Sequence, residues 1–161
     1  MLDPILHRTI QVMIFSVAPF VELRASIPFG ITKGLPPLVA LAAAVLASWI
    51  AIIPFFLIMD LFFDRFLSRF RLVRHFVEEV RARGHIYVER WGVLGVGIYV
   101  SIPLPGPGIY SGTVLAWLFG LPRRQAIVSL ALGVLVSALL VTAISTPAIA
   151  LIRRILSSMG Y

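Results

Sequence analysis

The sequence predicts an all-α integral membrane protein made of two inverted repeats, joined by an amphipathic basic helix. Each repeat is a re-entrant helical hairpin followed by a transmembrane helix. The 161 residues are 60% apolar and 13% charged, and the runs 35–59 and 125–152 carry no charge. Such runs exceed the roughly 20 residues that cross ~30 Å of hydrocarbon. Two of the four apolar blocks have helix breakers in their middle, and short motifs recur in both halves of the chain.

Two of the apolar blocks, 36–63 and 124–152, are typical of ordinary transmembrane spans. Pro36 and Pro37 stand where a helix can begin without losing a hydrogen bond. Pro54 and Pro147 lie within the spans and are expected to kink them.

The other two blocks, 5–32 and 92–121, are predicted to be re-entrant hairpins. The first carries Pro19, Pro28 and Gly30, and the second carries "PLPGPG" at 103–108. Broken backbone is tolerated at membrane depth only where protein or a water-filled cavity surrounds it. Two arms of about 12 residues, at ~1.5 Å per residue, each reach half of the bilayer. Four plain spans are the alternative, and the breakers favour hairpins.

The two halves of the chain also share motifs, which predicts one membrane domain with repeats at 1–63 and 92–161. "FSVAP" (15–19) resembles "YVSIP" (99–103), 84 residues later. "GLP" occurs at 34–36 and again at 120–122, 86 residues later. "LAAAVLAS" (41–48) resembles "LALGVLVS" (130–137), 89 residues later. If the connecting segment 64–91 is cytoplasmic, the two repeats have opposite topology, as in many transporters.

The net charge is +7, and the basic residues are concentrated in that connecting segment, because seven of the 14 lie between Arg65 and Arg90. Positive charge beside a span indicates a cytoplasmic segment facing anionic lipid, and nucleic acid is not expected as a partner. Apolar residues form one helical stripe in it, which predicts a helix on the inner leaflet or a dimerising seam: Phe66, Phe70, Val73, Val77 and Val80. The N-terminus lacks the pattern of a removable signal peptide.

Ionisable residues inside the apolar blocks are the candidates for chemistry. Glu22 and Arg24 stand near the middle of the first hairpin, and Lys33 is near a boundary. Charges in a membrane cost at least ~2.5–3.5 kcal/mol and usually face a cavity. Glu22 and Arg24 could converge in a broken segment between Pro19 and Pro28. There they either form a salt bridge that holds the turn or bind substrate. Asp60 and Asp64 are expected to be solvated boundary charges.

Enzymatic chemistry is not expected, nor is a cofactor or metal. The chain has no cysteine, and its three histidines, His7, His75 and His85, are not spaced with carboxylates as a zinc site requires. Ser101 and Ser111 flank the second break but lack a nearby base.

The stretches "ELRASIPFG" (22–30) and "PLPGPGIYSG" (103–112) resemble the small multidrug export protein family, which is grouped within the DedA superfamily. The resemblance covers essentially the whole chain. It implies two oppositely oriented hairpins that meet at mid-membrane, and it carries the family's first-hairpin glutamate over to Glu22. This chain has Phe29 and Ile31 where a second acidic residue is expected. The superfamily's second-hairpin arginines fall roughly at the positions of Ser101 and Gly106.

The resemblance and the residues together predict a membrane transporter of an amphipathic anionic substrate, with a polyprenyl-phosphate carrier lipid as the first choice and protons as coupling ion. The alternatives are proton-coupled export of cationic small molecules and a non-transporting scaffold. The protein is expected to be a homodimer among membrane lipids in a prokaryotic plasma membrane. The predicted site comprises Glu22, Arg24, Ser26, Pro28, Gly30, Ser101, Pro103, Pro105, Gly106 and Gly108.

Overall fold

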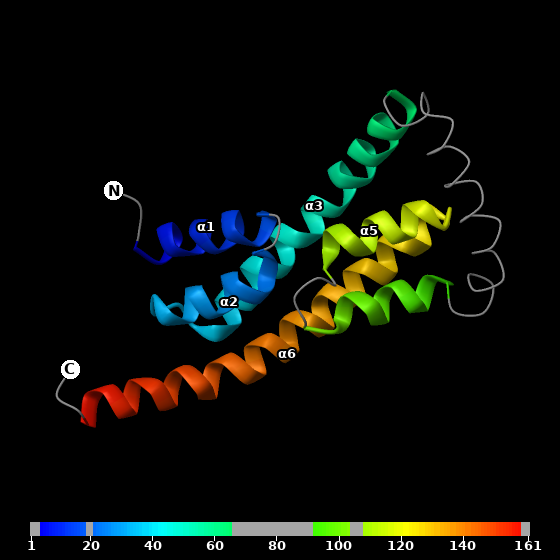
Figure 1. Ribbon diagram of the computed structural model, residues 1–161. Coiled ribbons are helices and arrows are strands. Elements are labelled where there is room, and N and C mark those ends of the chain that lie inside the picture. Colours follow the sequence, from blue (N-terminus) through cyan, green and yellow to red (C-terminus); the bar gives the residue numbers. More distant parts are fainter. Residues whose placement is uncertain (1–3, 19–20, 66–91, 104–107, 159–161) are drawn as a thin grey trace. The chain divides into compact units, whose positions relative to one another are not determined.

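The computed structural model describes residues 4–18, 21–65, 92–103 and 108–158, and these are helical apart from short turns (Figure 1). In chain order, the helices are α1 (Pro4–Val17), α2 (Glu22–Thr32), α3 (Pro37–Arg65), the helix Gly92–Ser101, α5 (Ile109–Leu118) and α6 (Arg123–Ser158).

The two predicted spans are confirmed as the long helices α3 and α6, which are long and apolar enough to cross a membrane. Both helices continue through their internal prolines, Pro54 and Pro147. Large apolar side chains are exposed along both: Leu46, Ile50, Ile53, Leu57 and Leu61 on α3, and Val128, Leu132, Leu139, Ile144 and Leu151 on α6. Exposing so much apolar surface to water is unfavourable, whereas lipid solvates it. The chain is therefore a membrane protein.

Each of the other two apolar blocks contains two short helices with a break between them. In the first block α1 and α2 pack against each other, and the break falls before Glu22. In the second block a Cβ on Gly112 of α5 would stand 2.4 Å from Val100, so α5 packs closely on the helix Gly92–Ser101. We refer to these helix pairs as the first and the second hairpin.

The prediction was wrong about two of the breakers, because Pro28 and Gly30 lie inside α2 rather than at a break. A proline within a helix removes one backbone hydrogen bond, but tertiary packing can hold the helix regardless. Gly30 serves this packing. A Cβ there would stand 2.7 Å from Val12 of α1 and 3.2 Å from Ala40 of α3.

The repeated "GLP" motif forms the same turn at the end of both hairpins. Gly34 and Gly120 adopt φ of +87° and +66°, the left-handed conformation that glycine takes without strain. Leu35 N–H donates to Gly30 O at 3.0 Å, and Leu121 N–H donates to Ala116 O at 3.0 Å. These bonds close a Schellman motif at the end of α2 and of α5.

Burial repeats along the chain at an interval of 86 residues from Glu22 onward. The following buried positions have buried counterparts: 22/108, 23/109, 26/112, 27/113, 30/116, 35/121, 40/126, 43/129, 44/130, 47/133, 48/134, 51/137 and 52/138. In the preceding helices the interval is 84, because buried Val12 and Ser16 match buried Val96 and Val100. The tip between the two helices is therefore two residues longer in the second hairpin.

The motif match at an interval of 89 does not agree with the structure. It would align buried Ala43 with Leu132, which is 57% exposed. Both segments are rich in alanine and leucine, so their letters match in more than one register, whereas burial distinguishes the registers.

The chain groups into two compact units, Met1–Ser48 with Leu135–Tyr161 and Trp49–Val134. Each unit holds one hairpin, the first part of the long helix that follows it and the last part of the other long helix. The predicted amphipathic helix at 64–91 lies outside the described residues beyond Arg65. The single domain with repeats at 1–63 and 92–161 stays a prediction.

Candidate functional site

Glu22 stands at the tip of the first hairpin in an unusual backbone conformation. It is the first residue of α2, is 8% exposed and has φ of +46°. No other residue of the described chain except glycine has positive φ. The N–H of Glu22 donates to Ala18 O at 3.1 Å across the break. Left-handed backbone costs a residue with a Cβ roughly 1–2 kcal/mol, and such strain gathers at functional sites.

Two serines join the arms of this hairpin next to Glu22. The hydroxyls of Ser16 and Ser26 lie 2.6 Å apart, and Ser16 Oγ donates to Val12 O at 2.8 Å. A serine hydroxyl has one proton. Since Ser16 gives its proton to Val12, Ser26 must donate to Ser16. Both serines are buried, at 1% and 0% exposure, so this short chain of hydrogen bonds is held away from solvent.

The predicted residues of the first hairpin divide between two sides of α2. Glu22, Ser26 and Gly30 follow one another at intervals of four and form one buried face. Arg24 and Pro28 are half-buried. The first turn holding Glu22 and Arg24 belongs to α2, so the prediction that they lie in a broken segment reaching to Pro28 was wrong.

In the second hairpin, the predicted residues that the structure describes form no comparable polar group. Ser101 is half-buried and donates to Ile98 O at 2.7 Å, and Pro103 is half-buried after the helix end. The buried Gly108 precedes α5 in extended backbone, and its N–H donates to Ser111 Oγ at 2.8 Å. Pro105 and Gly106 lie outside the described residues.

Ser16 is the member of the site that sequence reasoning missed. It lies within "FSVAP", the motif that recurs in the second hairpin. At the intervals of 84 and 86, Ser16 and Ser26 correspond to Val100 and Gly112, which are also in close contact. The first hairpin thus has a polar contact where the second has an apolar one. That comparison of the two halves is the signal that could have revealed Ser16.

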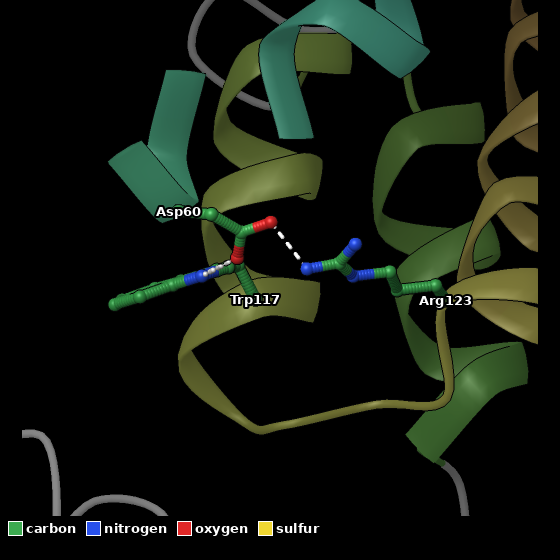
Figure 2. Close-up of polar contacts among 3 residues, drawn as sticks. All are labelled: Asp60, Trp117 and Arg123. Carbon is green, nitrogen blue, oxygen red and sulfur yellow. Dashed lines mark hydrogen bonds and ion pairs between the residues drawn. The ribbon is translucent and has the colours of Figure 1, made fainter. Parts of the chain in front are cut away.

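A second polar cluster joins the end of α3 to the second hairpin (Figure 2). The indole N–H of Trp117 donates to Asp60 Oδ1 at 2.9 Å, and Arg123 forms an ion pair with Asp60 Oδ2. The Asp60 side chain is 25% exposed. The prediction of a solvated boundary charge was therefore wrong for Asp60, because the carboxylate is used to hold α3, α5 and α6 together. The side chain of Asp64 lies outside the described residues.

We expect the hydrogen bond from the Trp117 indole to Asp60 to contribute more to the stability of the protein than the ion pair with Arg123. Substitutions that remove the two contacts separately test this. The Arg123 side chain is 66% exposed, so solvent screens the pair and we expect less than about 1 kcal/mol from it. Asp60→Asn keeps an oxygen acceptor for Trp117 and should change the melting temperature little. Asp60→Ala loses both contacts and should cost about 1–2 kcal/mol. Thermal unfolding in detergent measures the stability of both Asp60 variants. Arg123→Gln is the matched control, because it removes only the ion pair. Equal damage from Asp60→Asn and Asp60→Ala contradicts this account.

Comparison with known proteins gives one family. The family model described as "Putative small multi-drug export protein" matches residues 22–140. The match begins at Glu22 and includes the second helix of the first hairpin, α3, the second hairpin and the first half of α6. Neither a curated protein nor a solved structure shows significant similarity to the chain. Since the match covers more than half of its length, the chain belongs to this family of small multidrug export proteins.

Proposed function

We propose that the protein exports cationic amphipathic small molecules in exchange for protons, and that Glu22 binds both in turn. The buried, positive-φ position of Glu22 at the hairpin tip carries this proposal. A carboxylate within a membrane is costly and is usually retained for function, and backbone strain at the same residue adds to that cost. The family supports export of small molecules as the activity.

The proposed coupling follows from the chemistry of one carboxylate. With a proton bound, Glu22 is neutral and does not attract a cation. Without the proton it carries a negative charge in a site of low dielectric, where it pairs strongly with a cationic substrate. The two ligands therefore exclude each other, which is the minimum requirement for exchange. Ser16 and Ser26 fix the arms of the hairpin, so the carboxylate keeps its position while its charge changes.

The proposal includes the inverted topology of the two repeats. Support comes from contacts at the hairpin ends remote from their tips. Near the end of α3, Asp60 contacts Trp117 of the second hairpin, while α3 begins just after the first hairpin. Near the end of α6, Arg153 donates to Ile31 O and Thr32 O of the first hairpin, while α6 begins just after the second. In the proposal, the two hairpins enter the membrane from opposite faces, in the manner of inverted-repeat transporters.

Transport of a polyprenyl-phosphate carrier lipid is the second candidate. Arg24, half-buried in the same turn as Glu22, favours it, because a guanidinium binds phosphate well. The apolar second hairpin weighs against it. The proposal also places the protein in the DedA superfamily. It further includes a homodimer in the lipids of a prokaryotic plasma membrane, and transport without an enzymatic step. The scaffold alternative depends on the 64–91 segment.

Reconstituted vesicles test the proposal with ethidium as the cationic probe. We expect the wild-type protein to drive ethidium against its gradient when a proton gradient is imposed, and to stop when an uncoupler dissipates that gradient. Glu22→Gln should lower the rate at least tenfold. Asp60→Asn, a matched loss of a carboxylate that holds helices together, should keep at least half of it.

The same vesicles distinguish the candidates. Ethidium transport that survives in Glu22→Gln rejects the site. Absence of ethidium transport in the wild type, together with flipping of a phosphate-headgroup lipid that is lost in Arg24→Gln, would replace the proposal by the second candidate.

A further inference from the structure

Four basic side chains gather where the first hairpin ends, and neither the fold nor the proposed function uses their excess charge. They come from three elements of one unit: Arg8 on α1, Lys33 just after α2, and Arg153 and Arg154 on α6. We call them the basic cluster. Three of the four are exposed, and Arg8 is half-buried.

Distances place three members of the basic cluster around the last turn of α2, and Arg154 follows Arg153 on α6. Arg153 Nη2 lies 3.0 Å from the carbonyl oxygens of both Ile31 and Thr32. Arg8 Nη1 lies 3.3 Å from the point where a Cβ on Gly34 would stand. Lys33 occupies the C-cap of α2, and its Nζ is 5.7 Å from the ring centre of Phe29.

The charge of this cluster is only partly balanced. The C-terminal end of α2 carries a partial negative charge, equivalent to about half an electron, that attracts nearby cations. Within residues 4–18, 21–48 and 135–158, the one carboxylate is that of Glu22. Glu22 stands at the opposite end of this 11-residue helix, about 15 Å away. Among the described residues of this unit, the basic cluster therefore leaves a net positive charge, which an external anion would balance.

The surroundings of the cluster indicate what that anion is attached to. Aliphatic side chains next to the arginines are more than 45% exposed: Ile5 and Leu6 beside Arg8, and Leu151, Ile152, Ile155 and Leu156 beside Arg153 and Arg154. Basic groups with exposed aliphatic neighbours are typical of the membrane interface, where the charges reach headgroups and the apolar groups remain among acyl chains. A free anion in water needs no such apolar rim.

From this arrangement we propose that the basic cluster binds the phosphate headgroup of an anionic phospholipid at the membrane surface. Arg8, Lys33 and Arg154 supply the charge, and the aliphatic rim receives the upper part of the acyl chains. Arg153 is a positioning residue, because its guanidinium already binds the carbonyls of α2 and keeps α6 beside the turn. The site is separate from Glu22, and this proposal does not depend on which substrate the protein transports.

The test measures the melting temperature of the full-length protein in neutral detergent, with phosphatidylglycerol or phosphatidylcholine added. We expect phosphatidylglycerol to raise it by several degrees more than phosphatidylcholine. Lys33→Gln combined with Arg154→Gln should reduce this difference by at least half, and each single change should reduce it by less. Arg124→Gln removes an exposed arginine from the other end of α6 and should leave the difference intact.

Three results overturn the proposal. One is a phosphatidylglycerol effect that persists in the double variant. Another is an equal loss in Arg124→Gln, which would mean attraction to total charge only. The third is an equal rise with inorganic phosphate alone, which would assign the cluster to a free anion. Because Lys33 and Arg154 are exposed and Arg153 is left in place, the double variant should fold, and the single variants provide the same comparison if it does not.

Discussion

At position 22, glycine is expected to give a more stable protein than alanine, while both substitutions abolish proton-coupled export. In an ordinary helix the order is reversed, because glycine is about 1 kcal/mol less favourable than alanine. At this hairpin tip φ is +46°, where any residue with a Cβ is strained by roughly 1–2 kcal/mol and glycine is not. Both variants lack the carboxylate, so the comparison isolates the backbone from the side-chain contacts.

Thermal unfolding and ethidium export are measured on the same purified variants. A glycine variant that melts above the alanine variant, with neither of them exporting, means that the chain keeps a strained residue at the hairpin tip for its activity. If alanine is the more stable, the positive φ is not a property of the folded protein, and the argument from strain fails. Export by either variant removes Glu22 from the mechanism.

Gly133→Val is expected to damage the structure more than the substitutions at Glu22 or Asp60. A Cβ at this position would stand 2.5 Å from the backbone oxygen of Gly97 and 3.1 Å from the Cβ of Val100. Backbone cannot move aside as a flexible side chain can, so the helix Gly92–Ser101 must separate from α6. Overpacking costs about 1–3 kcal/mol. Separation also breaks the hydrogen bond from Ser129 Oγ to Val93 O.

The matched control is Ala143→Val, which adds two methyl groups to an exposed position on the same helix. We expect Gly133→Val to lower the melting temperature by several degrees or to prevent purification as a monodisperse protein, and Ala143→Val to leave it within about a degree. Small residues let membrane helices approach closely, and this pair of variants measures that approach directly. If the two variants have the same stability, the close contact between Gly97 and Gly133 is wrong.

The sequence was sufficient to predict the long helices and the presence of a break in each of the other apolar blocks. Both depend on local properties, namely the length of apolar runs and the positions of prolines and glycines. The turns at Gly34 and Gly120 were also within reach, since "GLP" recurs and glycine alone accepts the left-handed conformation without strain.

Other features depend on contacts that local sequence does not specify. Pro28 looks like a breaker, yet α2 continues through it because Val12 and Ala40 pack around nearby Gly30. Asp60 looks like a boundary charge, yet partners 57 and 63 residues away hold it. Ser16 and Ser26 are ordinary residues in a helix until the two arms bring their hydroxyls together.

The two hairpins share their burial pattern but not their chemistry. Glu22, Ser16 and Ser26 in the first correspond to Gly108, Val100 and Gly112 in the second, at the intervals that burial defines. In the proposed division, the second hairpin supplies only shape and the first supplies the charge. One ionisable residue, at the tip of the first hairpin, would then be enough to move one proton in each transport cycle. This division is the basis for assigning the exchange to Glu22.

Proton release on substrate binding tests this central claim most directly. Purified protein in weakly buffered detergent solution is mixed with ethidium while the pH is recorded, beginning at a pH at which the carboxylate is protonated. We predict release of about one proton per bound ethidium from the wild type and from Asp60→Asn, because cation and proton compete for one carboxylate. We predict no release from Glu22→Gln. Ethidium that binds the wild type without releasing a proton, or that releases the same amount from Glu22→Gln, would contradict exchange at Glu22.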